Sequence, residues 1–128
     1  MTPSNRGKPR ASRVEVRKFL AGLKSALASG TVTSYPRSKN QESLAQLGLD
    51  QSATPEILGM LQVADYSGGP EPHDRGFPGD VWIFGTDLDS MELYIKILIM
   101  TGKRGQKCYS CISIHKADYQ IFHPYPDG

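Results

Sequence analysis

The 128-residue sequence predicts an α+β fold, in which helices near the N-terminus pack on the apolar face of an antiparallel β-sheet. Two observations lead to this prediction. In the first half of the chain, apolar residues recur at helical spacing, beginning at Val16. In the second half, two runs rich in isoleucine and aromatic residues, 92–100 and 107–115, flank a turn that holds two glycines. Such a pair of runs is typical of a β-hairpin.

A chain of this length is expected to form one domain. Residues 1–11 contain basic residues, proline and glycine without apolar periodicity, which predicts a flexible basic arm. Residues 12–119 would form the folded domain. Residues 120–128 contain two prolines and are expected to form an extended C-terminal tail.

The first helix is the most clearly marked element. Ser12 and Glu15 have the spacing of a capping box, in which each side chain bonds the other residue's backbone N–H. Gly30 is a typical residue just after a helix end. We therefore expect a helix over residues 13–29.

Two shorter helices are expected after an extended segment. Residues 31–39 have strand-like propensity up to Pro36, which predicts an extended connection or a short edge strand. A helix over 41–47 would be capped by Asn40, and another would begin with Thr54 as its N-cap. Both are too short to be stable alone, so they need the sheet.

The stretch 67–79 contains four glycines and three prolines and is expected to lack regular structure. Long loops in compact domains are often functional, so His73 and Arg75 are candidate substrate-binding residues. A surface loop without a role is the alternative. Residues 80–85, apolar on both faces, predict an inner strand.

The turn suggests a register for the hairpin. Pairing Thr101 with Gln106 would place Ile95 opposite Ile112 on an apolar face that belongs to the core. A shift by one residue would drive Lys96 into the core at a large cost, which favours this register.

The opposite face of the predicted hairpin gathers polar groups. Tyr94 would lie opposite Ser113, and Glu92 opposite His115, with Lys96 on the same face. A phenol, an ammonium group, a carboxylate and an imidazole would thus lie within a few residues of one another.

Composition excludes several classes of function. No run approaches the roughly 20 apolar residues of a membrane span, and the first residues do not form a signal peptide, so a cytoplasmic protein without membrane contact is expected. The first 24 residues hold seven basic residues and one acidic residue. This basic segment could contact a phosphate backbone or an acidic protein, or it could simply be solvated.

Neither a metal nor a cofactor is expected. Cys108 and Cys111, with His115 and His123, could suggest zinc, but such cysteine pairs usually lie on a tight turn and not within a strand. The chain also lacks a Gly-x-Ser-x-Gly motif and a glycine loop that could hold phosphate before a helix.

The remaining candidate catalytic residues are Tyr94, Lys96, His115 and Lys116. Together they could cleave RNA without a metal. A base removes the proton of a ribose 2′-hydroxyl, a cation stabilises the charge on the phosphoryl oxygens, and an acid protonates the leaving oxygen. Ordinary half-buried sheet residues are the alternative explanation.

Three segments resemble a known family: Asp80-Val-Trp-Ile-Phe-Gly85, Glu92-Leu-Tyr-Ile-Lys-Ile97 and Ile112-Ser-Ile-His115. Shorter matches precede them in the same order, at 30–33, 44–49, 57–61, 65–66 and 69–72. With these segments the chain resembles the motility quorum-sensing regulator (MqsR) family of toxins over about residues 14–119. The resemblance implies a RelE-like fold and a type II toxin that cleaves mRNA without a metal and is neutralised by a cognate antitoxin protein.

The resemblance also implies roles for individual residues. Tyr94 matches the family's active-site tyrosine, and Lys96 matches a lysine two residues later. His115 and Lys116 match the end of the last strand, where the family places a catalytic basic residue.

Two positions differ from the family pattern. Ser67 replaces a frequent lysine, and Ile83 stands in the place of an active-site glutamine. These differences leave a second hypothesis, a non-catalytic RNA- or protein-binding module on the same fold. If the chain is a nuclease, Lys103 and Arg104 at the hairpin turn and the basic first helix would contact RNA phosphates.

Overall fold

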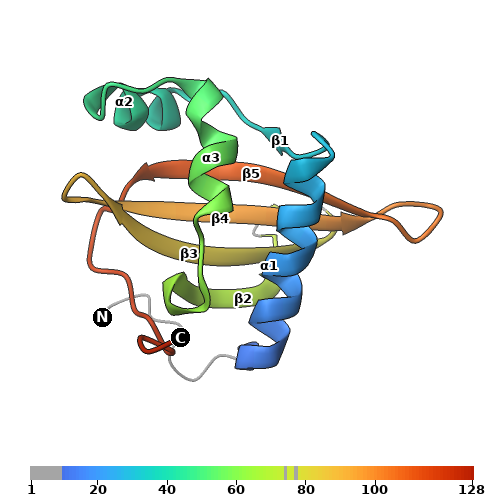
Figure 1. The fold of residues 1–128 in the computed structure, drawn as a ribbon. Coiled ribbons are helices and arrows are strands. Elements are labelled where there is room, and N and C mark those ends of the chain that lie inside the picture. The colour runs from blue at the N-terminus through green and yellow to red at the C-terminus, as the bar shows by residue number, and fades with distance from the viewer. Residues whose placement is uncertain (1–9, 74, 77) are drawn as a thin grey trace.

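The computed structural model describes residues 10–73, 75–76 and 78–128. It contains a five-stranded sheet with α1 and α3 across one face and α2 along one edge (Figure 1). The helices are α1 (Arg13–Ala28), α2 (Ser38–Gln46) and α3 (Thr54–Gly59), with 3₁₀ turns η1 (Gln51–Ala53) and η2 (Val63–Asp65). The strands are β1 (Thr33–Ser34), β2 (Tyr66–Pro72), β3 (Asp80–Leu88), β4 (Met91–Thr101) and β5 (Lys107–Lys116).

The predicted α+β class, with helices packed on a sheet, is confirmed. The strand order is β1-β5-β4-β3-β2. The sheet is mixed, not wholly antiparallel, because the short strand β1 pairs in parallel with β5. The other three pairings are antiparallel.

The helix-covered face of the sheet carries the larger core. Phe19 of α1 stacks on Trp82 of β3, with ring centroids 4.2 Å apart. Tyr66 and Phe84 are fully buried beside them. The helix α1 forms as predicted, since the capping box of Ser12 and its partner three residues later is present.

The opposite face, which we call the outer face, carries a smaller apolar cluster. Its buried members are Val81, Ile83, Leu98 and Ile112. The strand β3 therefore has buried apolar residues on both faces, and the register places it between β2 and β4. This confirms the prediction of an inner strand.

The prediction that Asn40 caps α2 is wrong. The helix begins at Ser38, and Asn40 lies inside it with no exposed surface. Its amide donates to the carbonyls of Tyr35 (3.1 Å) and Ile112 (3.3 Å) and accepts from the N–H of Ile114 (3.0 Å). The strand β1 pairs with only two residues of β5. The buried backbone groups of β5 that follow them need other hydrogen-bond partners, and the Asn40 side chain provides them.

Two other local predictions also need correction. Thr54 is not an N-cap but lies within α3, because the 3₁₀ turn η1, capped by Asp50, leads directly into the helix. Residues 66–72, most of which were expected to form a loop, make the edge strand β2. Its pairing with β3 is irregular, and a Cβ at Gly69 would collide with the Val81 carbonyl, so glycine allows the close approach of the two strands.

The predicted hairpin register is also wrong, by one residue near the turn. Thr101 pairs with Lys107 because Gln106 belongs to the turn, where its carbonyl accepts from the Gly102 N–H at 2.7 Å. Farther along, Ile112 is the extra residue of a β-bulge, which moves the pairing by one more residue.

The shift changes the faces of residues 108–112 of β5, but Ser113, Ile114 and His115 and the residues of β4 keep their predicted faces. Tyr109 and Cys111 lie in the main core, in place of the predicted Cys108 and Ser110. Ile112 points to the outer face, not to the core as predicted. The predicted core face of β4 is confirmed, since Leu93, Ile95 and Ile97 are fully buried in the main core.

The segment after β5 crosses the ends of β4 and β3 and returns towards the start of α1 (Figure 1). Ile121 packs on Gly85 of β3. The Tyr125 ring stacks on Tyr66, and its hydroxyl donates to the carbonyl of Ala11 at 2.6 Å. Residues 1–9 of the expected basic arm lie outside the described residues, whereas Ala11 is buried.

None of the helices in the described part of the chain has both the length and the apolar character needed to cross a membrane.

We predict that Asn40→Ala lowers the free energy of unfolding by about 2–3 kcal/mol, because it leaves buried backbone groups of β5 without partners. Urea denaturation measures this change. Glu42→Ala, an exposed position in the same helix, is the matched control and should change stability by less than about 0.5 kcal/mol. Equal stability of the two variants would contradict the role of Asn40.

The turn between β3 and β4 gives a second prediction. Asp89 and Ser90 both have positive φ, 49° and 68°, as in a type I′ turn. Ser90→Gly should stabilise the protein by about 1 kcal/mol, since glycine adopts this conformation without strain. Ser90→Ala retains the strain and should bring no gain. Thermal unfolding compares the two variants with wild type. If Ser90→Ala were as stable as Ser90→Gly, strain at this position would be ruled out.

Candidate functional site

Three of the predicted catalytic residues come together on the outer face. The bulge places Tyr94 directly opposite His115, and their rings stack with centroids 5.4 Å apart and an interplanar angle of 26°. Lys96 lies opposite Ser113, one step along the same face. Glu92, the predicted partner of His115, lies beyond this group, with its carboxylate 3.8 Å from His123. The partners differ from the predicted ones, but the polar face itself forms.

The environment of His115 favours a neutral imidazole. Burial lowers its pKa below the usual 6.5, the hydrogen bond to the Lys116 carbonyl opposes this shift, and the nearby cations Lys39 and Arg37 lower the pKa further. Asp118 acts in the opposite direction. At neutral pH the ring is therefore uncharged.

The tautomer of His115 follows from its hydrogen bond. Nδ1 lies 3.0 Å from the Lys116 carbonyl oxygen, which can only accept, so Nδ1 carries the proton. In the neutral ring Nε2 then bears the lone pair. His115 is arranged to accept a proton through Nε2, which is the function of a general base.

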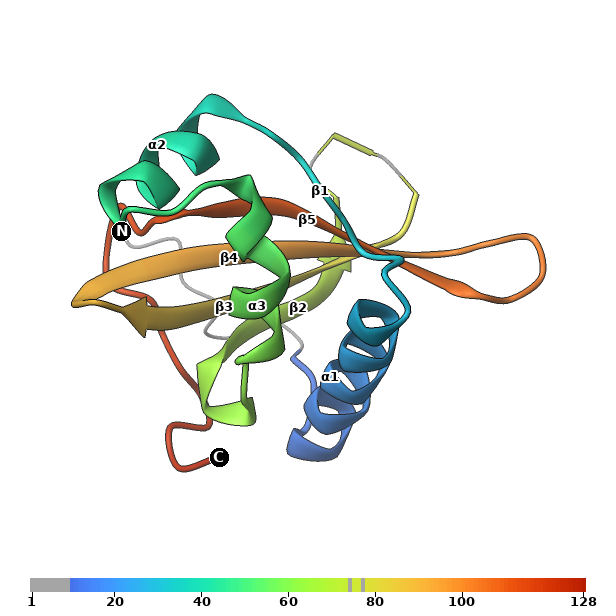
Figure 2. The same cartoon turned by 45° about the horizontal axis from the view of Figure 1, so that its top comes forward.

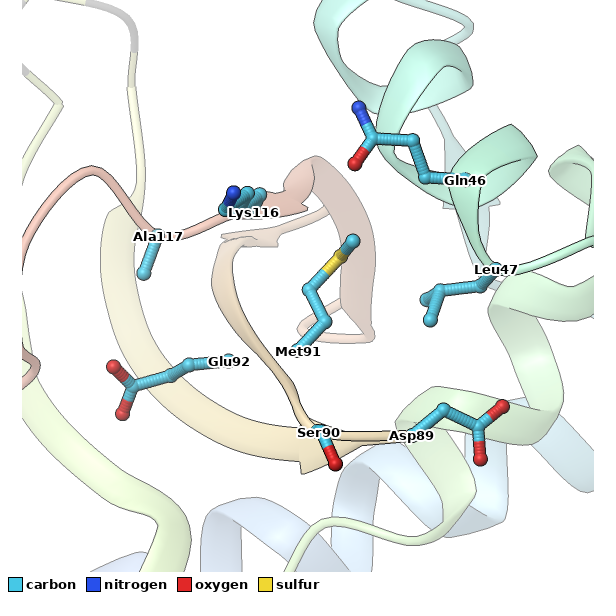
Figure 3. A pocket seen from close by; sticks show the side chains of 8 residues that line it. All are labelled: Gln46, Leu47, Asp89, Ser90, Met91, Glu92, Lys116 and Ala117. Atoms are coloured by element: carbon cyan, nitrogen blue, oxygen red, sulfur yellow. The ribbon is translucent and has the colours of Figure 1, made fainter.

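Lys116, by contrast, is on the other side of the sheet. It pairs with the buried Leu93 and lines a hollow of about 430 Å³ between the end of α2 and the β3–β4 turn (Figure 3). The hollow is also lined by Gln46, Leu47, Asp89, Ser90, Met91, Glu92 and Ala117. The Lys116 side chain therefore does not join Tyr94 and His115, although its carbonyl holds the imidazole.

The candidate substrate-binding residues His73 and Arg75 lie on the segment between β2 and β3. The Arg75 N–H donates to Nδ1 of His73 at 3.0 Å. The segment stands away from the sheet on the side opposite α1 and α3 (Figure 2). It ends where Asp80 pairs with Ile99, three residues beyond Lys96, or about 10 Å along the strand. It thus borders the far end of the outer face.

The other candidate RNA contacts are more distant. Lys103 and Arg104 are exposed at the tip of the β4–β5 hairpin, which extends beyond the rest of the sheet (Figure 1). The basic helix α1 covers the core face, so its charges do not line the outer face.

Sequence reasoning missed Arg37. This residue precedes α2, and its Nη1 donates to the Ile112 carbonyl and to the Ser113 hydroxyl, both at 3.2 Å. It thereby reaches the strand that carries His115. Only the position of α2 beside β5 brings these residues together, and no local signal in the sequence indicates it.

The two cysteines lie on opposite faces of the sheet. Cys108 is exposed, whereas Cys111 is buried in the core and burial raises the pKa of its thiol to about 12. Within residues 10–73, 75–76 and 78–128, no group of three or more His, Cys, Asp or Glu side chains could hold a metal ion. The alternative of a zinc site at these cysteines therefore lacks a ligand set among these residues.

No protein-family model, curated protein or solved structure matches the chain. The function must therefore be inferred from the site itself.

One side chain of the site is apolar, because Ile83 lies opposite Lys96 on the outer face. Ser67, the other position that differs from the MqsR pattern, is buried on β2.

The lowered pKa of His115 predicts a pH dependence of stability. Below pH 6.5 the unfolded chain takes up a proton at this residue before the folded chain does, so stability falls as the pH falls, and the loss ends below the folded-state pKa. His115→Gln removes this contribution. Urea unfolding of both proteins between about pH 7.5 and 5 should show that wild type loses more stability than the variant. Parallel curves would mean that the pKa of His115 is not lowered.

Proposed function

We propose that this chain is the toxin of a type II toxin–antitoxin system and acts in the cytoplasm as a metal-independent endoribonuclease on mRNA. The observation that supports this proposal best is the stacked pair of Tyr94 and His115, in which Nε2 is left to accept a proton. The resemblance to the MqsR toxins supports the same chemistry and implies an antitoxin protein as partner.

The proposed reaction begins at a ribose. His115 Nε2 takes the proton of the 2′-hydroxyl, and the 2′-oxygen bonds to the adjacent phosphorus. The bond from phosphorus to the 5′-oxygen breaks, which leaves a 2′,3′-cyclic phosphate. The departing 5′-oxygen needs a proton, a role open to the Tyr94 phenol or to water.

Lys96 would stabilise the negative charge on the phosphoryl oxygens. It is half-buried and, within the described part of the chain, forms no hydrogen bond or ion pair. A partly desolvated cation interacts more strongly with developing charge than one in bulk water. Tyr94 is also partly exposed, so its ring could contact an unstacked base, as aromatic side chains do in single-stranded RNA recognition.

A second candidate function is a non-catalytic module that binds RNA or a protein partner. Ile83 favours it, because this isoleucine places an apolar side chain where a further polar catalytic group would face Lys96. In this case the outer face would be a docking surface, and RNA would be bound but not cut.

We predict that His115→Ala lowers the cleavage rate by about 10²–10⁴-fold, the usual contribution of a general base. A long mRNA is incubated with the purified chain in EDTA, without partner, and the new 5′ ends are mapped. His123→Ala, a histidine outside the site, is the matched control and should cleave like wild type. Circular dichroism verifies that each variant is folded.

Three outcomes separate the hypotheses. Discrete cuts by wild type that disappear in folded His115→Ala support the nuclease. Unchanged cleavage by folded His115→Ala would contradict the assigned role. Intact RNA with wild type, both alone and with ribosomes added, would favour the binding module.

A further inference from the structure

The guanidinium group of Arg37 forms hydrogen bonds with the described residues through only one of its nitrogens. Nη1 carries two protons, and it donates to the Ile112 carbonyl and to the Ser113 hydroxyl, each at 3.2 Å. Nε and Nη2 form the other edge of the group, and no side chain of the described residues bonds to them. Arg37 is exposed, so this edge is accessible to a ligand.

Lys96 is the cross-strand neighbour of Ser113. Directly paired residues have Cβ atoms about 4.5–5.5 Å apart. The buried Ser113 thus accepts a hydrogen bond from Arg37 and is paired across the strands with Lys96. Neither cation forms an ion pair with any residue that the structure describes.

A neighbouring cation, unlike Arg37 and Lys96, does have an acidic partner. Lys39, two residues after Arg37, forms an ion pair with Asp118 at 2.8 Å. A bound anion would supply the counter-charge that both Arg37 and Lys96 lack among the described residues. The free edge of Arg37 has the fork geometry that binds phosphate in bidentate fashion, while lysine contributes a point charge.

We propose that Arg37 and Lys96 form a binding site for one phosphate group of an RNA chain, next to Ser113. The identity of the ligand as RNA rests on the proposed function, but the anion site itself rests on this arrangement. His115 is two residues from Ser113, about 7 Å along β5, so the phosphate held here is the reacting one, next to the 2′-hydroxyl on which His115 acts, and Lys96 keeps the role given above. The site would fix the position of that phosphate relative to the base.

The first test measures binding of an RNA oligonucleotide that carries 2′-deoxy substitutions and therefore cannot be cut. Fluorescence anisotropy at salt concentrations from about 50 to 200 mM gives the slope of log affinity against log salt. Arg37→Ala should lower the slope by about 0.7, the value for one phosphate contact on a single strand, and should weaken binding by about tenfold at low salt. Arg37→Lys keeps the charge and should restore most of the slope.

Two control variants separate ligand binding from a structural role. Glu42→Ala, an exposed position in the same helix α2, tests for a general effect on this helix, and the salt slope should not fall as it does in Arg37→Ala. Lys39→Gln removes a neighbouring cation that is already paired with Asp118, and it should change the slope less than Arg37→Ala does. If Lys39→Gln reproduced the loss seen in Arg37→Ala, the loss would reflect general positive charge and the proposal would be overturned.

A second measurement tests the anion site independently of RNA. Inorganic phosphate is titrated into the full-length protein, and the Ser113 amide is followed by NMR. A saturable shift in wild type that is lost in Arg37→Ala supports the site, and no shift in wild type refutes it. If wild type binds phosphate but neither binds nor cleaves RNA, the proposed function fails while the anion site stands. If wild type binds RNA and Arg37→Ala keeps its slope, the site fails while the function stands.

Discussion

The free edge of β5 imposes the constraint on which the rest of the structure depends. Its backbone groups are buried, yet β1 pairs with only two of its residues. Side chains of α2 complete the edge: the Asn40 amide bonds the backbone of Ile112 and Ile114, and the Ser43 hydroxyl accepts from the Lys116 N–H at 2.8 Å. Side chains of α2 thus make hydrogen bonds that a neighbouring strand would otherwise make, and they fix the helix beside β5. The helix covers an edge that could otherwise pair with another chain.

The position of α2 has electrostatic consequences for the outer face. It carries Arg37 to the hydroxyl of Ser113 and brings Lys39 near His115. Burial and both cations lower the pKa of the imidazole, so the ring stays neutral, which is the state that the proposed general base requires. The same element therefore supplies the hydrogen bonds that stabilise the sheet and two charges that lower the pKa of the His115 imidazole.

The bulge at Ile112 decides which side chains meet. Without the extra residue, the alternation of β5 would turn Ile114 out of the core and His115 into it. With it, Ile114 is buried and His115 stacks on Tyr94. One additional residue in the strand thus allows an apolar core and a polar face to exist on the same hairpin.

The sequence by itself determined the features that depend on neighbouring residues. The capping box of α1, the alternation along β4 and the presence of Tyr94 and Lys96 on one face are local patterns, and the structure contains them. Only the tertiary structure decided the register, the side on which Lys116 lies and the approach of Arg37 to Ser113. These features depend on a bulge and on contacts between residues about 75 positions apart, for which a single sequence carries no local energetic signal.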